Sequence, residues 1–214
     1  AKNSDQRSQL DIQNEIVTQG GVFILLEVLS RHANDEIINK GVALIFGFLT
    51  NSNESSKDEI YNASGILALV ESMKRHERFA GVQETACSAL KNLVNRSVWH
   101  PDIVTHHATQ QMMKAMKRFP KNDALQNEAC WMLSNLTARA PKIDLTAMVP
   151  SVVAIVASAM RSHSGNEDLQ LRACTTLYVL HSRGYGKHLR EVDMIPEVKK
   201  AQRYSSAKES ANLV

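Results

Sequence analysis

The sequence predicts an all-α fold in which similar helical units stack into a solenoid, and two markers support this interpretation. The first is a helical motif with one cysteine at residues 85–93, 126–137 and 172–180, in which the cysteine recurs after 43 and then 44 residues. The second is the apolar pattern of residues 21–32, which returns at residues 65–76, an offset of 44. Because two independent markers share one period, the chain is predicted to be a repeat array.

Each unit is predicted to contain a short helix followed by two longer ones. Short helices are expected at residues 11–18 and in the segments 56–61, 101–106 and 144–148. The second helix, with about three amphipathic turns, is expected at residues 21–32, 65–76, 108–119 and 152–163. A polar loop with turn residues follows each second helix, and an apolar residue then opens the third helix at Ile38, Val82, Leu125 and Leu169.

These elements predict a single domain over residues 1–214. Its repeats are expected at about 11–54, 55–99, 100–142 and 143–187, with a partial repeat at 188–214. The partial repeat restarts near Pro196 but carries the polar residues Lys199, Lys200, Gln202 and Arg203. Because a terminal repeat faces water on one side, we expect this polar segment to cap the array.

Composition limits the class of protein. A chain of 214 residues with 43% hydrophobic residues can bury a substantial core. The formal charge is only +3, and the basic residues are spread along the chain, so a nucleic-acid partner is not indicated. The sequence contains no apolar run near the roughly 18 residues that a membrane span needs, so direct membrane insertion is not expected either.

The three cysteines, Cys87, Cys130 and Cys174, occupy the same position in successive repeats. Neighbouring helices pack about 8–10 Å apart, whereas zinc binds sulfur at about 2.3 Å, so one thiol per helix cannot close around a metal. We therefore interpret the cysteines as small core residues. Unpaired buried thiols are typical of a reducing compartment, which predicts a cytoplasmic protein.

The third helices carry the pattern Val-Gln-x-x-Ala-x-x-Ala-Leu-x-Asn-Leu at residues 82–93 and a close variant at residues 125–136. With a glycine before the second helix and a unit of about 43 residues, this pattern resembles the armadillo repeat over roughly residues 11–205. The resemblance implies a right-handed superhelix whose third helices line a concave groove. It further implies that the groove binds a segment of a partner protein.

Trp131 and Asn135 lie four residues apart and share one face of the third helix in the third repeat. They resemble the Trp and Asn with which importin-alpha, a member of the family, holds extended peptides. The other repeats have Ser88 and Asn92, Leu44 and Phe48, and Thr175 and Val179 at these positions. One complete pair among four repeats argues against an importin-like reader of basic signals.

The residue types support a binding role independently of the family. An Asn amide can satisfy both polar groups of a peptide unit, and a Trp offers a large apolar surface with little rotamer freedom to lose. The alternatives are a Trp131 buried between repeats and Asn side chains that bond to the neighbouring third helix.

A second row of side chains follows the Asn position by four residues and consists of Arg96, Arg139 and Arg183. Basic residues at a helix C-terminus are ordinarily explained by the helix dipole and the last carbonyls. The functional alternative is that this Arg row favours an acidic or phosphorylated partner. At the other end, the apolar Leu44 and Phe48 are either covered by an N-terminal segment or upstream repeat, or form a hydrophobic end of the binding surface.

Catalytic signatures are missing from the sequence. Gly184-Tyr185-Gly186 lacks the third glycine of a dinucleotide fingerprint, and His76-Glu77 lacks the second histidine of a zinc protease motif. The best metal candidate, His100 with His106 and His107, is disfavoured because adjacent helical side chains point apart. We therefore predict no cofactor, no metal and no enzyme activity.

The sequence thus predicts a non-catalytic scaffold or adaptor that binds an extended or helical protein segment, with an acidic segment as one possibility. The leading contacts are Trp131, Asn135 and Asn92, with Ser88, Phe48, Thr175 and the Arg row as further members of the predicted site. One alternative is an adaptor tethered to a membrane or organelle by a segment upstream of Ala1, where a lipidation signal would lie. A second alternative is a regulatory domain of a larger enzyme.

Overall fold

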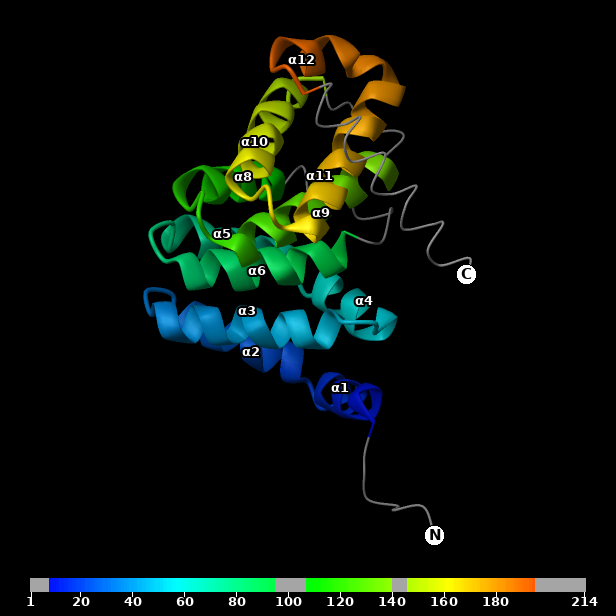
Figure 1. Ribbon diagram of the computed structural model, residues 1–214. Helices are drawn as coiled ribbons and strands as arrows, with labels where there is room; N and C mark the ends of the chain where they lie inside the picture. The colour runs from blue at the N-terminus through cyan, green and yellow to red at the C-terminus, as the bar shows by residue number, and fades with distance from the viewer. Residues whose placement is uncertain (1–7, 95–106, 140–145, 195–214) are drawn as a thin grey trace.

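The computed structural model describes residues 8–94, 107–139 and 146–194, and within these ranges the chain is helical, with no strand. The short helix predicted at 101–106 lies outside them, as do residues 144–145, Trp99, His100, His106 and the partial repeat from Pro196 onward. The elements, coloured from blue to orange in Figure 1, are α1 (Gln9–Thr18), α2 (Gly21–Arg31), α3 (Glu36–Thr50), α4 (Glu54–Asn62), α5 (Gly65–Arg75), α6 (Ala80–Leu93), α8 (Ala108–Arg118), α9 (Asp123–Arg139), α10 (Val149–Ser162), α11 (Glu167–Leu180), η2 (His181–Tyr185) and α12 (Gly186–Glu191).

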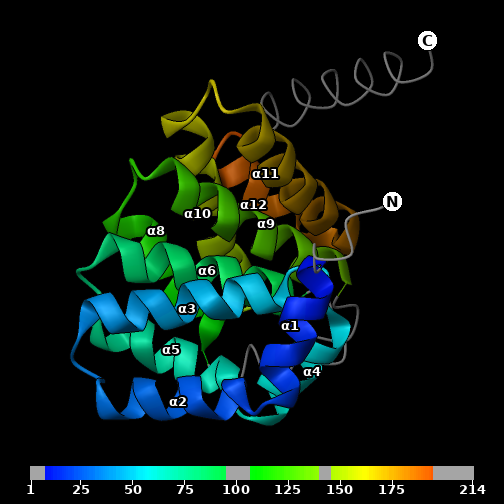
Figure 2. The same ribbon diagram turned by 90° about the horizontal axis from the view of Figure 1, so that it is seen from below.

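The helices form two rows that run the length of the molecule. The third helices α3, α6, α9 and α11 are stacked side by side, and each packs mainly against the next (Figure 1). The second helices α2, α5, α8 and α10 form a parallel row, which is clear where α2 and α5 lie beside α3 and α6 in Figure 2. This consecutive packing confirms the predicted α-solenoid.

The corner between the first and second helix requires a residue without a side chain. A Cβ atom on Gly21 would lie 2.6 Å from the carbonyl oxygen of Ile16, and one on Gly65 would lie 2.7 Å from that of Ile60. The residue before each glycine is left-handed, with φ of +77° at Gly20 and +64° at Ser64. The short helix therefore folds back tightly onto the second helix of its own repeat.

A glutamine in each of the later third helices closes the turn that precedes it. Gln83 Nε2 donates to the carbonyls of Met73 and His76, both at 2.9 Å. Gln126 donates in the same way to Met116 and Phe119, and Gln170 to Met160 and His163. These carbonyls lie at the C-terminal ends of the second helices, where the helix itself provides no donor. The Gln of the sequence pattern is therefore a structural residue.

The cysteines lie where the third helices pack together. Cys87, Cys130 and Cys174 are buried, as the sequence predicted, and they form no disulfide with one another. Burial raises the pKa of Cys87 to about 12, helped by the nearby carboxylates of Glu128 and Glu84. Burial also raises the pKa of Cys130 to about 12, against the opposing effect of Arg172. The two thiols are therefore protonated and act as small apolar side chains.

The first repeat has an apolar face that the other described residues leave uncovered. Ile24 on α2 is 58% exposed, whereas Ile155 at the same repeat position is 5% exposed. Ile45 on α3 is 37% exposed, whereas its counterparts Ala89, Met132 and Thr176 are completely buried by the preceding third helix. We call Ile24 and Ile45, with Leu44 and Phe48, the N-terminal apolar face.

The histidines that follow the second helices also differ between the first repeat and later repeats. The ring of His76 donates from Nε2 to the carbonyl of Ala33 at 2.9 Å, and the ring of His163 donates to that of Pro120 at 2.7 Å. Each bond ties a repeat to the one before it. His32, at the equivalent position of the first repeat, is exposed, and the described residues provide no partner for its ring.

Candidate functional site

Side chains at two repeat positions follow the stack of third helices and form what we call the third-helix surface. Within the described residues these side chains are half-buried or exposed, and none is sealed in the core. Its members are Leu44 and Phe48 on α3, Ser88 and Asn92 on α6, Trp131 and Asn135 on α9, and Thr175 and Val179 on α11.

Trp131 lies in the middle of this surface and is half-buried. Lys91 Nζ, from α6, lies over the indole at 4.3 Å from the ring centroid. Arg172 Cζ, from α11, lies over it at 3.4 Å. Because α6 and α11 pack on either side of α9, this one aromatic side chain connects three successive repeats through cation–π contacts.

The two cations differ in their other partners. Lys91 Nζ is 2.6 Å from Glu128 Oε2, and both side chains are largely buried, so this ion pair is well shielded from solvent. Arg172 is half-buried, and its Nε is buried without a hydrogen-bond acceptor among the described residues. Partial burial lowers the pKa of Arg172, while Asp168 and Glu128 oppose that shift. Arg172 therefore remains a cation with unused donor capacity.

The two Asn residues of the predicted site lie on α6 and α9. Asn92 Nδ2 donates to the carbonyl of Gly47 at 3.1 Å and to Thr50 Oγ1 at 3.2 Å, both on α3. This is the bond to the neighbouring third helix that the sequence left open as the structural alternative. Asn135 lies one turn beyond Trp131 and is also half-buried. Asn135 and Trp131 therefore share one face of α9 on the third-helix surface.

The remaining predicted residues are distributed along the stack. Phe48 is exposed, Ser88 is half-buried, and Thr175 is exposed with its hydroxyl donating to the Leu171 carbonyl at 2.9 Å. Arg183 donates from Nη1 to the Thr137 carbonyl near the end of α9, at 3.1 Å. Arg96 lies outside the described residues.

The side chain of Arg139 is likewise not among the parts of the chain that the structure describes. The Arg row is therefore represented by Arg183 alone, whose bond to Thr137 has the carbonyl-capping form that the sequence gave as the ordinary explanation.

Sequence reasoning missed Lys91, Glu128 and Arg172. Glu128 and Arg172 are 44 residues apart and hold the same position in successive third helices. In a solenoid, equivalent positions of adjacent repeats lie side by side. The opposite charges of Glu128 and Arg172, one repeat apart, could therefore have predicted this cluster from the sequence.

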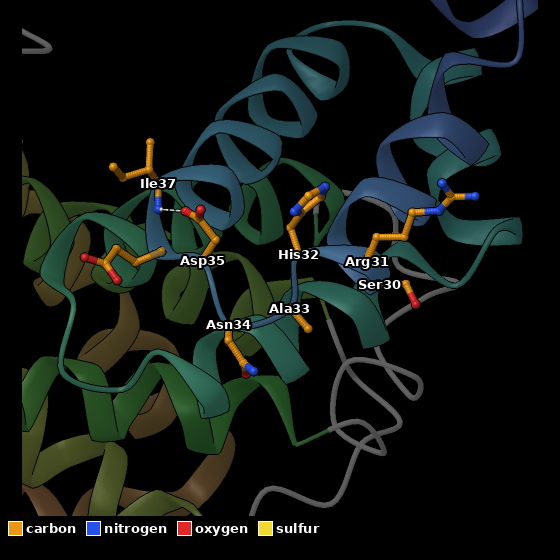
Figure 3. A pocket seen from close by; sticks show the side chains of 8 residues that line it. Ser30, Arg31, His32, Ala33, Asn34, Asp35 and Ile37 are labelled. Atoms are coloured by element: carbon orange, nitrogen blue, oxygen red, sulfur yellow. Dashed lines mark hydrogen bonds between the residues drawn. The ribbon is translucent and has the colours of Figure 1, made fainter.

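Two hollows lie away from the third-helix surface, at turns between second and third helices. One is lined by Ser30, Arg31, His32, Ala33, Asn34, Asp35, Glu36 and Ile37 (Figure 3). Asp35 in this hollow accepts from the backbone N–H groups of Ile37 at 2.9 Å and Ile38 at 3.1 Å, so it caps α3. A second hollow lies at the equivalent turn around His163, whose ring bonds to Asp123 and Pro120. These polar groups serve the turns themselves.

Two further findings concern the described residues alone. They contain no cluster of three His, Cys, Asp or Glu side chains arranged to hold a metal ion. Of the candidate trio His100, His106 and His107, only His107 belongs to the described residues, and it is exposed. None of their helices combines the length and the apolar character that crossing a bilayer demands.

Stacked helical units with a glycine corner, a Gln-closed turn and a row of third helices define an armadillo-type solenoid. The family model described as "LRRK2 ARM repeat" matches residues 6–144, which is more than half of the chain. The chain therefore belongs to the ARM-repeat family.

Among curated proteins, the chain is similar to "Protein aardvark" of Dictyostelium discoideum, with 27% identity over 129 residues. The match covers 55% of this chain and 17% of aardvark, so the chain spans a small part of that relative. No solved structure matches the chain significantly.

Proposed function

We propose that the chain is a non-catalytic interaction scaffold that holds a segment of a partner protein along the third-helix surface. The observation that carries the proposal is the position of Trp131 and Asn135, half-buried on α9 and flanked on both sides by stacked third helices. A large aromatic side chain on a surface that spans several repeats offers a central anchor with room for contacts on either side. Membership of the ARM-repeat family supports the same class of function.

The chemistry along the third-helix surface indicates what kind of segment would fit. Its α3 end is apolar, with Leu44 55% exposed and Phe48 37% exposed. At its other end, Arg172 on α11 stacks on Trp131, and Arg183 on η2 bonds to the Thr137 carbonyl near the end of α9. A complementary partner segment, extended or helical, has apolar residues at one end and polar or acidic residues at the other.

Cellular location belongs to the same proposal. Cysteines without disulfides are typical of reducing compartments, and Cys87, Cys130 and Cys174 are buried and form no disulfide with one another. We therefore place the scaffold in the cytoplasm, with a protein partner and no nucleic acid.

The test is quantitative affinity capture from the native cell, followed by direct binding. Bait proteins are the wild type, the double variant Trp131→Ala with Asn135→Ala, and a surface variant Thr175→Glu, which changes an exposed residue. Lys114→Ala with Lys117→Ala on the second helix α8 serves as the control, because both residues are exposed in the other row.

The proposal is supported by a protein that the wild type and the α8 control retain and that the other two baits lose. A purified segment of that protein must also bind the chain directly. Loss from the α8 control with full retention by the double variant overturns it. Melting curves of every bait show whether a loss reflects unfolding.

A further inference from the structure

We propose that Arg172, stacked on Trp131, binds a carboxylate or phosphate group of the partner segment. This inference rests on the proposed function, because it names the chemistry that one subsite of the third-helix surface recognises. It assigns a role to a residue that the sequence pattern did not single out.

The first support is the geometry of the cation. With Cζ only 3.4 Å from the ring centroid, the guanidinium of Arg172 lies in close contact with the indole of Trp131. The contact restricts the orientation of the guanidinium before a ligand arrives. An Arg fork that is already oriented loses little freedom when it forms two parallel hydrogen bonds to an oxyanion.

The second support is the distribution of charge around Arg172. Lys91 and Glu128 neutralise each other across 2.6 Å. Asp168, one helical turn before Arg172 on α11, is exposed, and no ion pair within 4.0 Å joins it to Arg172 among the described residues. Asp168 and Glu128 act on Arg172 from a distance, since both counteract the fall of its pKa. The guanidinium therefore lacks a direct anionic partner.

The third support is the accessibility of the guanidinium. The Nε of Arg172 is buried without an acceptor among the described residues, whereas its two terminal nitrogens are not among the buried unpaired atoms. A carboxylate or phosphate that approaches end-on can accept from both terminal nitrogens. Thr175, exposed one turn further along α11, marks the side of the helix from which a ligand can approach.

The experiment uses four synthetic peptides with the same apolar half, made of Leu and Phe, and a second half rich in Glu, phosphoserine, Gln or Lys. Binding to the whole chain is measured by fluorescence anisotropy at low and at physiological ionic strength. We expect the Glu and phosphoserine peptides to bind more tightly than the Gln peptide, and the Lys peptide to bind most weakly. Salt should reduce these differences.

Variants separate recognition from structural support. Arg172→Gln should weaken the acidic peptides about tenfold to a hundredfold and leave the Gln peptide unchanged, while Arg172→Lys restores part of the loss. Asp168→Asn should strengthen the acidic peptides, because it removes a competing charge. If Asp168 instead held Arg172 for purely structural reasons, this variant would weaken them or lower the melting temperature.

The outcomes distinguish the two proposals. If the Gln or Lys peptide binds as tightly as the Glu peptide and Arg172→Gln changes nothing, the anion subsite is overturned and the scaffold function stands. If none of the four peptides binds, and the double variant at Trp131 and Asn135 still captures the partner, both proposals are overturned. Tight binding of acidic peptides that depends on Arg172 supports both.

Discussion

Arg172 on α11 and Trp131 on α9 are in direct contact, with the guanidinium carbon 3.4 Å from the centroid of the indole ring. Lys91 reaches the same ring from α6. The Trp is therefore a junction between repeats as well as a member of the third-helix surface. Its loss is expected to affect both stability and binding, and the two effects have to be measured separately.

Trp131→Ala should lower the free energy of unfolding by about 1–3 kcal/mol, less than a fully buried Trp because the side chain is half-buried. Trp131→Phe should recover much of this loss, since a smaller ring keeps both cation contacts. Urea unfolding followed by circular dichroism provides the measurement. Equal stability of the alanine variant and the wild type would contradict the junction between repeats.

Gln126→Ala should destabilise the chain by about 1–3 kcal/mol, because it leaves the carbonyls of Met116 and Phe119 without their buried donor. Gln110→Ala on α8 is the matched control, since Gln110 is exposed and its replacement should change stability by less than about 0.5 kcal/mol. The measurement is the midpoint of urea unfolding for both variants. Similar midpoints for the Gln126 and Gln110 variants would show that the Gln-closed turn contributes little to the free energy of unfolding.

Stability should fall in alkaline solution because of Cys87 and Cys130. Their pKa is raised from 9.0 to about 12 in the folded chain, so the folded state keeps both protons after the unfolded state has lost them. The stabilisation is complete below pH 9.0 and is lost as pH rises towards about 12. In this window each thiol contributes a slope of about 1.4 kcal/mol per pH unit.

Unfolding free energies measured from pH 8 to 11, for the wild type and for Cys87→Ala, test this expectation. The variant should show a shallower alkaline decline. A thiol reagent added at pH 8 should react with these cysteines only as fast as the chain opens, and rapid labelling of the native protein would contradict their burial.

The N-terminal apolar face should tolerate charge. Ile24→Lys with Ile45→Lys should change the free energy of unfolding by less than about 1 kcal/mol and reduce binding of a hydrophobic dye, because both side chains are exposed. Met132→Lys, at the repeat position of Ile45, should prevent folding, because Met132 is completely buried. Dye fluorescence and thermal melting of the two proteins make the comparison.

The fold could be predicted from the sequence because solenoid packing is periodic. Once Cys87, Cys130 and Cys174 were aligned, the row of third helices and the burial of the thiols followed. The spacing also placed Trp131 and Asn135 on one face of α9, where both are half-buried. The repeat boundaries remain a prediction.

The details of the candidate site were not predictable in the same way. These details depend on the orientation of long side chains that come from neighbouring repeats. The spacing of residues along one helix does not determine that orientation. Lys91 and Arg172 meet Trp131 across helix boundaries. Asn92 turns its amide to Gly47 and Thr50 on α3, and its position in the repeat did not decide between this bond and contact with a partner.

The ring bonds of His76 and His163 have a mechanical consequence. Each one latches a unit to its predecessor, while His32 has no such latch within the described part of the chain. In an assembly held by nearest-neighbour coupling, each such bond must break before the two units that it joins can separate. Replacing His76 should therefore lower the force that parts the first unit from the second, and replacing His163 should do the same between the third and the fourth.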